Sequence, residues 1–248
     1  MRRAAGVWKQ NVAHSDATGG TAVAISFDMT TPGIHESEQQ LADGGRSMTV
    51  ERFDPDRKGI TPAVLLLHGA DGLRHRGPIY RTMARHLAGH GLSVLIPHYF
   101  ERTGTTGYPS LSRPMDFLGW MEAVGDVIRS AGPGPTGLVG FSLGAYLALA
   151  AAGHEERVGA VVACCGGLPP LLAAGFTRMP PVLVLHGERD AVVPVSEARA
   201  LEDWLRQRGT TNEVVIYLDQ GHSLHGPAAD DALKRTTAFL RRHLLAVV

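Results

Sequence analysis

Residues 138–150, Leu-Val-Gly-Phe-Ser-Leu-Gly-Ala-Tyr-Leu-Ala-Leu-Ala, place a glycine-flanked serine between a short apolar run and a helix-forming run. A strand, a sharp turn and a helix in this order are the context of a G-x-S-x-G nucleophile elbow. Glycines at 140 and 144 leave room for the turn, which would strain the backbone of Ser142 and expose its hydroxyl. Alone, the pentapeptide also fits an ordinary turn in which Ser142 caps the helix.

The composition is that of an ordinary globular protein. The chain has 248 residues, and its 24 Lys and Arg balance 24 Asp and Glu, so no global field favours nucleic acid or an acidic membrane surface. No apolar run approaches the roughly 20 residues needed to span a bilayer. The adjacent Cys164 and Cys165 exclude a disulfide framework and favour a reducing compartment, so we expect a cytoplasmic location.

Short apolar runs alternate with segments of helical spacing. We expect strands at 62–67, 92–96, 138–139, 158–164, 182–185 and 213–218, and helices at 80–90, 117–128, 145–150, 168–176, 196–207 and 230–245. Ser196 is the expected N-cap of its helix, and 98–114 is expected to be a loop. This alternation predicts an α/β fold, with a mostly parallel, doubly wound sheet and helices on both faces.

The N-terminal part divides into two regions. Residues 1–34 show no clear period, and we expect a flexible extension with one candidate strand at 22–28. Runs at 36–41 and 47–53 flank Asp43-Gly44-Gly45, which predicts a β-hairpin. Residues 35–248 are therefore expected to form one domain.

Ligands of such sheets bind beyond the carboxyl ends of the strands. The run 62–67 is followed by His68-Gly69-Ala70-Asp71-Gly72, a turn that could aim backbone N–H groups at a developing oxyanion. Ala70 is the best candidate donor there, and the N–H of Leu143, next to the nucleophile, would be the second. Alone, the turn also fits a simple connection between strand and helix.

Two later strand ends supply an acid and a base. Asp190 follows the run 182–185 and is preferred to Glu188 because Val192-Val193-Pro194 fixes the chain beyond it. His222 follows the run 213–218 on a glycine-preceded loop, and an imidazole there suits a general base. The order Ser142, Asp190, His222 is that of α/β-hydrolase triads.

The motifs LLLHGADGL, IPHYFER, GLVGFSLGAYLALA, LHGERDAVVP and DQGHS resemble the α/β-hydrolase superfamily and, within it, the dienelactone hydrolase-like family. The resemblance runs from about residue 36 to the C-terminus. The segment between Cys164 and Val182 is too short for the lid domain of many relatives, so a lidless enzyme is expected.

The departures from the family bear on the substrate. The family's nucleophile is often cysteine, where this chain has Ser142, and its gating glutamate is replaced by Gly69. Arg102 matches a family arginine that holds the substrate carboxylate, although a solvated loop arginine is an equal alternative. A second such arginine is replaced by Gly226. The resemblance therefore implies a serine carboxylesterase rather than an enol-lactone hydrolase.

We therefore expect a serine hydrolase that cleaves small-molecule carboxylic esters, thioesters or lactones through an acyl-enzyme, as a monomer or small homo-oligomer. Neither a metal nor an organic cofactor is implied, and no nucleic acid or membrane partner. The acyl pocket would draw on Tyr99, Phe100, Tyr108 and 166–176, although core packing is the alternative for these aromatic residues. A prolyl-oligopeptidase-type peptidase, similar at GERDAVVP and GHS, and a non-catalytic binding protein on the same fold are the rival hypotheses.

Overall fold

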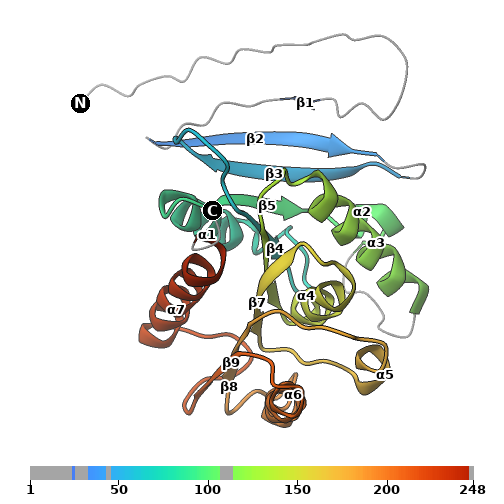
Figure 1. Ribbon diagram of the computed structural model, residues 1–248, viewed down its shortest axis with the longest axis vertical. Helices are drawn as coiled ribbons and strands as arrows, with labels where there is room; N and C mark the ends of the chain where they lie inside the picture. The colour runs from blue at the N-terminus through green and yellow to red at the C-terminus, as the bar shows by residue number, and fades with distance from the viewer. Residues whose placement is uncertain (1–23, 26–32, 43–45, 107–113, 246–248) are drawn as a thin grey trace.

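The computed structural model describes residues 24–25, 33–42, 46–106 and 114–245. Within these ranges the strands join into one sheet in the order β1-β2-β3-β5-β4-β6-β7-β8-β9 (Figure 1). The strands are β1 Ala24–Ile25, β2 Ile34–Leu41, β3 Met48–Pro55, β4 Ala63–Leu67, β5 Ser93–Pro97, β6 Thr136–Phe141, β7 Val158–Cys164, β8 Val182–Gly187 and β9 Asn212–Tyr217. The helices are α1 Gly77–Gly89, α2 Phe100–Thr103, α3 Pro114–Ser130, α4 Leu143–His154, α5 Pro170–Ala173, α6 Val195–Gln207 and α7 Pro227–Leu244.

The sheet is parallel from β5 through β4, β6, β7 and β8 to β9, and antiparallel where β1, β2 and β3 extend it. This confirms the mostly parallel α/β architecture. Helices α1 and α7 lie on one side of the sheet, and α3 and α4 lie on the other (Figure 1). Burial on both faces explains why the central strands are continuous apolar runs.

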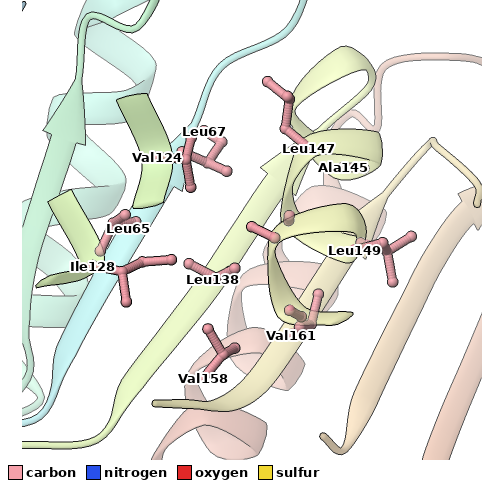
Figure 2. Packing of buried hydrophobic residues seen from close by; sticks show 14 of the residues in the cluster. Leu65, Leu67, Val124, Ile128, Leu138, Ala145, Leu147, Leu149, Val158 and Val161 are labelled. Atoms are coloured by element: carbon pink, nitrogen blue, oxygen red, sulfur yellow. The ribbon is translucent and has the colours of Figure 1, made fainter. Parts of the chain in front are cut away.

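Successive residues of the central strands serve opposite faces, because side chains alternate along a strand. Leu65 and Leu67 of β4 pack with residues of α3 and α4, such as Val124 and Leu147 (Figure 2). The intervening Val64 and Leu66 belong to the cluster that α1 and α7 cover. The parallel strands are thus held rigidly from both sides, with their carboxyl ends at one edge.

The predicted hairpin is confirmed, because β2 and β3 pair antiparallel with Leu41 opposite Met48. Its turn, 43–45, lies outside the described residues. So does most of 1–34, where Ala24 and Ile25 pair with β2. No helix in the described ranges is long and apolar enough to cross a membrane. The segment joining β7 to β8 contains the four-residue helix α5 and no lid.

The structure corrects two local expectations. The predicted loop at 98–114 contains a short helix, α2, which ends at Gly104 with a left-handed φ of 69°. Ser196 does not cap α6, because this helix begins one residue earlier at Val195, with Pro194 at the N-cap position and no side-chain cap bond. The fixed φ of proline presets the entry to the helix and moves its start ahead of the serine.

Candidate active site

Ser142 lies in a strained turn between β6 and α4. Its φ of 53° and ψ of −118° are unfavourable for a residue with a side chain. A Cβ on Gly140 would lie 2.1 Å from the carbonyl oxygen of Gly144, and one on Gly144 would lie 2.2 Å from that of Leu67. Both glycines are therefore required by the turn. The alternative of a helix-capping serine is wrong, because Ser142 makes no side-chain cap bond.

The structure brings the three predicted triad residues together. The Nε2 atom of His222 lies 3.0 Å from Ser142 Oγ, and its Nδ1 atom lies 2.8 Å from Asp190 Oδ2. Because an ionised carboxylate only accepts hydrogen bonds, Nδ1 carries the proton and donates it. The lone pair of Nε2 therefore faces the serine hydroxyl, which is the arrangement needed for a general base.

Asp190 is held as an anion in a buried position. Its Oδ1 accepts the backbone N–H groups of Val192 at 2.8 Å and Val193 at 2.9 Å. Burial by itself raises the pKa of Asp190, but the hydrogen bonds that it accepts outweigh this effect and lower the pKa. Glu188, the rival acid, is exposed.

His186 is a neighbour of Asp190 that sequence reasoning missed. It is fully buried, and its Nε2 donates to the carbonyl oxygen of Val193 at 2.9 Å and lies 3.3 Å from Asp190 Oδ2. The imidazole thereby ties together the turn that holds the carboxylate. Its position in the LHG part of the LHGERDAVVP motif is the one signal that could have pointed to it.

The two candidate N–H donors to an oxyanion have no hydrogen-bond acceptor among the described residues. Leu143 is the first residue of α4, and the first N–H groups of a helix have no partner within it. The turn around Ala70 is closed by a bond of 3.0 Å from the N–H of Gly72 to the carbonyl oxygen of Gly69. Among the described residues, none accepts the N–H of Ala70 or of Leu143.

Two tyrosines fix this turn, and the sequence did not reveal this role. The N–H of Gly69 donates to Tyr80 Oη at 3.1 Å, and Tyr99 Oη donates to the carbonyl oxygen of His68 at 2.5 Å. The ring of Tyr99 also stacks on His68, with centroids 4.0 Å apart. Desolvation by burial lowers the pKa of His68 to about 4, so its imidazole is neutral and adds no charge to the turn.

The predicted pocket residues divide between lining and support. Phe100 lines a cavity of about 490 Å³ together with His68 and Asp71, and Ser142, Asp190 and His222 are not among its lining residues. Tyr99 is completely buried and supports the turn through its hydrogen bond to the carbonyl oxygen of His68. Arg102 is paired with Asp126 at 2.8 Å, and both side chains are about nine-tenths buried. Tyr108 lies outside the described residues.

The segment after β7 also borders Ser142. A Cβ on Gly166 would lie 2.5 Å from the Cβ of Ala145 and 3.0 Å from the carbonyl oxygen of Ser142, so this backbone packs directly on the elbow. The preceding Cys165 has a left-handed φ of 51°. Burial raises the pKa of Cys165 to about 11, so its thiol stays protonated near neutral pH and leaves Ser142 as the candidate nucleophile.

Comparisons with known proteins agree with this geometry. A model of the dienelactone hydrolase family matches residues 50–244. Carboxymethylenebutenolidase of Rhodococcus opacus is 30% identical over 195 residues, which are 67% of this chain and 77% of that protein.

Solved structures support the fold. A candidate dienelactone hydrolase of Klebsiella pneumoniae superposes with a TM-score of 0.70 at 21% identity, covering 85% of this chain and all of that one. Esterase PE8 superposes with a TM-score of 0.56 at 27% identity, covering 74% of this chain and 93% of that one. The expected α/β-hydrolase fold is thereby confirmed.

Proposed function

Because the chain belongs to the dienelactone hydrolase family and is a hydrolase acting on ester bonds, we propose that it is a serine carboxylesterase. Ser142, His222 and Asp190 would form its triad, and its substrates would be esters without a carboxylate on the acyl group. The observation that carries the proposal is the continuous relay of 3.0 Å and 2.8 Å from serine through imidazole to carboxylate. Thioesters and lactones would react by the same chemistry.

In the acylation step, Ser142 Oγ attacks the substrate carbonyl carbon while its proton passes to His222 Nε2. Asp190 stabilises the imidazolium that forms, and its bond to Nδ1 preserves the tautomer. The carbonyl oxygen becomes an oxyanion, which the N–H groups of Ala70 and Leu143 bind. The imidazolium then gives its proton to the departing alkoxide, and the acyl group stays on Ser142.

Deacylation repeats the same steps with water as the nucleophile. His222 Nε2 takes a proton from water, the resulting hydroxide attacks the acyl-serine, and the proton returns to Ser142 Oγ as the acid leaves. Each turnover therefore restores the starting protonation state.

The preference for uncharged acyl groups rests on how the nearby arginines are paired. Arg102, for which a substrate contact and a solvated loop position were equal alternatives, is neither solvated nor unpaired, because it forms a largely buried ion pair with Asp126. Arg76 lies between the oxyanion turn and the histidine loop, with its Nε 2.5 Å from Asp71 Oδ2 and its Nη1 3.4 Å from Ser223 Oγ. A substrate carboxylate would have to compete with Asp71 for Arg76 and with Asp126 for Arg102. Displacing an existing ion pair costs more when its groups are buried, as those of Arg102 and Asp126 are.

Two assays test this proposal. A fluorophosphonate probe should label the wild type and leave Ser142→Ala unlabelled; equal labelling of both would sink the serine mechanism. p-Nitrophenyl butyrate should be hydrolysed with a higher kcat/KM than the p-nitrophenyl monoester of succinate, which carries a carboxylate of similar size. Faster turnover of the charged ester would contradict the preference, and faster turnover of a peptide p-nitroanilide would favour the peptidase hypothesis.

A further inference from the structure

A thiol that the proposed mechanism does not use lies against the acid and the base. Cys165 follows β7, Asp190 follows β8 and His222 follows β9, and one donor atom from each lies within 4.8 Å of the other two. Cys165 and Asp190 are buried, whereas the His222 side chain is 26% exposed and offers an approach from solvent. We propose that these three side chains form a zinc site whose occupation stops hydrolysis.

The donor set suits zinc better than other common divalent ions. One sulfur, one imidazole nitrogen and one carboxylate oxygen are all zinc ligands, whereas Mg²⁺ and Ca²⁺ require oxygen. With bonds of about 2.3 Å to sulfur and 2.0–2.1 Å to nitrogen and oxygen, tetrahedral coordination places the donor atoms about 3.3–3.6 Å apart. Shifts of about 1 Å would therefore bring the three side chains onto one ion, with water in the fourth position.

Zinc binding would change which nitrogen of His222 carries the proton. In the metal-free site, Nδ1 of His222 carries the proton and donates it to Asp190. When zinc binds Nδ1, that proton moves to Nε2, and the thiol proton of Cys165 is released to solvent as the sulfur binds the metal. An Nε2 that already carries a proton cannot accept one from Ser142. Zinc binding would thus remove the general base without touching the substrate.

Binding is tested first, without reference to activity. Calorimetric titration of the wild type with Zn²⁺ should show one site, and Co²⁺ should give a thiolate-to-metal charge-transfer absorption band. Because changes in outer-shell partners alone cost about 10–100-fold in metal affinity, Cys165→Ser should weaken binding at least about tenfold and abolish the band. The matched control is Cys164→Ser, since the neighbouring thiol is equally buried and packs in the cluster under α1 and α7.

Equal zinc affinity of Cys165→Ser and the wild type would overturn the site, as would loss of binding in Cys164→Ser alone. Thermal melts show whether each variant is folded. His222→Ala removes a second ligand from a partly exposed position and should weaken binding similarly, so the test does not depend on the buried cysteine variant.

The inhibitory effect rests on the proposed function, and the metal site does not. Zinc should inhibit p-nitrophenyl butyrate hydrolysis reversibly by EDTA, Mg²⁺ should not, and half-inhibition in Cys165→Ser should need at least about tenfold more zinc. Each rate is compared with the same variant's metal-free rate. Zinc bound at Cys165 with undiminished hydrolysis would overturn the inhibition, whereas a protein without esterase activity would overturn the proposed function and leave the binding result standing.

Discussion

Replacing Asp190 by asparagine tests the role of the acid with little change in shape. Oδ1 of Asp190 accepts two backbone N–H groups, from Val192 and Val193, while Oδ2 accepts Nδ1–H of His222. The asparagine oxygen will keep the two backbone bonds, because its amide would face two donors there. The NH₂ group then replaces Oδ2 and points a donor at the histidine.

The imidazole must respond by presenting the Nδ1 lone pair to the new amide. Nε2 of His222 then carries the proton, and Ser142 loses its base. In a Ser-His-Asp site, this wrong tautomer costs about 10⁴-fold in kcat, which corresponds to about 5.4 kcal/mol at 1.36 kcal/mol per tenfold. The Tm should fall little, since both backbone bonds survive. Asp190→Ala removes these bonds as well, and leaving the buried N–H of Val193 unpaired costs about 1–3 kcal/mol of stability.

The assay is p-nitrophenyl butyrate hydrolysis near neutral pH, together with a thermal melt. Glu188→Gln is the matched control, because the rival carboxylate is on the same turn but is exposed. We expect this control to stay within a factor of two or so of the wild type, as exposed changes usually have small effects. A folded Asp190→Asn that keeps more than about a tenth of wild-type kcat, with the loss appearing in Glu188→Gln, would refute the assignment.

Three further predictions concern the turn at Gly144, the ion pairs of His98 and the turn at Gly69. Gly144→Ala should lower the Tm and abolish probe labelling, because its Cβ would lie 2.2 Å from a backbone oxygen, while Gly175→Ala, with no atom within 4 Å, should do neither. Burial alone lowers the pKa of His98, but hydrogen bonds to two carboxylates raise it to about 9, so the stability gained is complete below about pH 6.5 and is lost as the pH rises through about 9. Between pH 6 and 10 the wild-type Tm should therefore fall more than the Tm of His98→Gln. Parallel falls of the two Tm values would contradict this. Gly69→Glu should reduce kcat at least about tenfold, because its Cβ would lie in ordinary contact with the Ser142 Cβ, at 3.5 Å, and its carboxylate would add negative charge beside the developing oxyanion. Unchanged kinetics would contradict this prediction.

Sequence reasoning worked best where the physical cause is local. The elbow could be predicted because the steric demand of the turn selects glycine two positions on either side of Ser142. Asp190 could be preferred to Glu188 because the apolar residues and proline that follow it fix the chain. Ser196 failed as a helix cap for an equally local reason, the proline two residues earlier, which the prediction did not weigh.

The supporting contacts could not be predicted, because they join distant parts of the chain. Tyr80 reaches the turn at Gly69 from α1, and the ion pair of Arg102 with Asp126 joins α2 to α3. Nothing in the spacing of these residues indicates a partner. The arginine is the clearest example, since its match to a family position says nothing of the aspartate that pairs with it.

The precision of the site comes from backbone bonds that continue the parallel sheet beyond its strands. The N–H of Ser142 donates to the carbonyl oxygen of Cys164 at 2.9 Å, and that of Cys165 donates to Leu185 at 2.9 Å. The N–H of Glu188 donates in the same way to Tyr217 at 2.9 Å. The loops that carry Ser142, Cys165 and Asp190 are therefore each tied to the end of the next strand.

This arrangement accounts for where the backbone is strained. Ser142 and Cys165 are the non-glycine residues with positive φ in the described part of the chain, and each such residue costs about 1–3 kcal/mol. Strain of this size persists only where surrounding contacts fix the conformation, and both residues donate their N–H to the neighbouring strand. The hydrogen bond from the N–H of Cys165 to Leu185 should therefore fix the position of Ser142 more than it stabilises the fold. Because Gly166 packs against Ser142, relaxing the backbone at 165 by Cys165→Gly should displace Ser142 and lower kcat while leaving the fold intact.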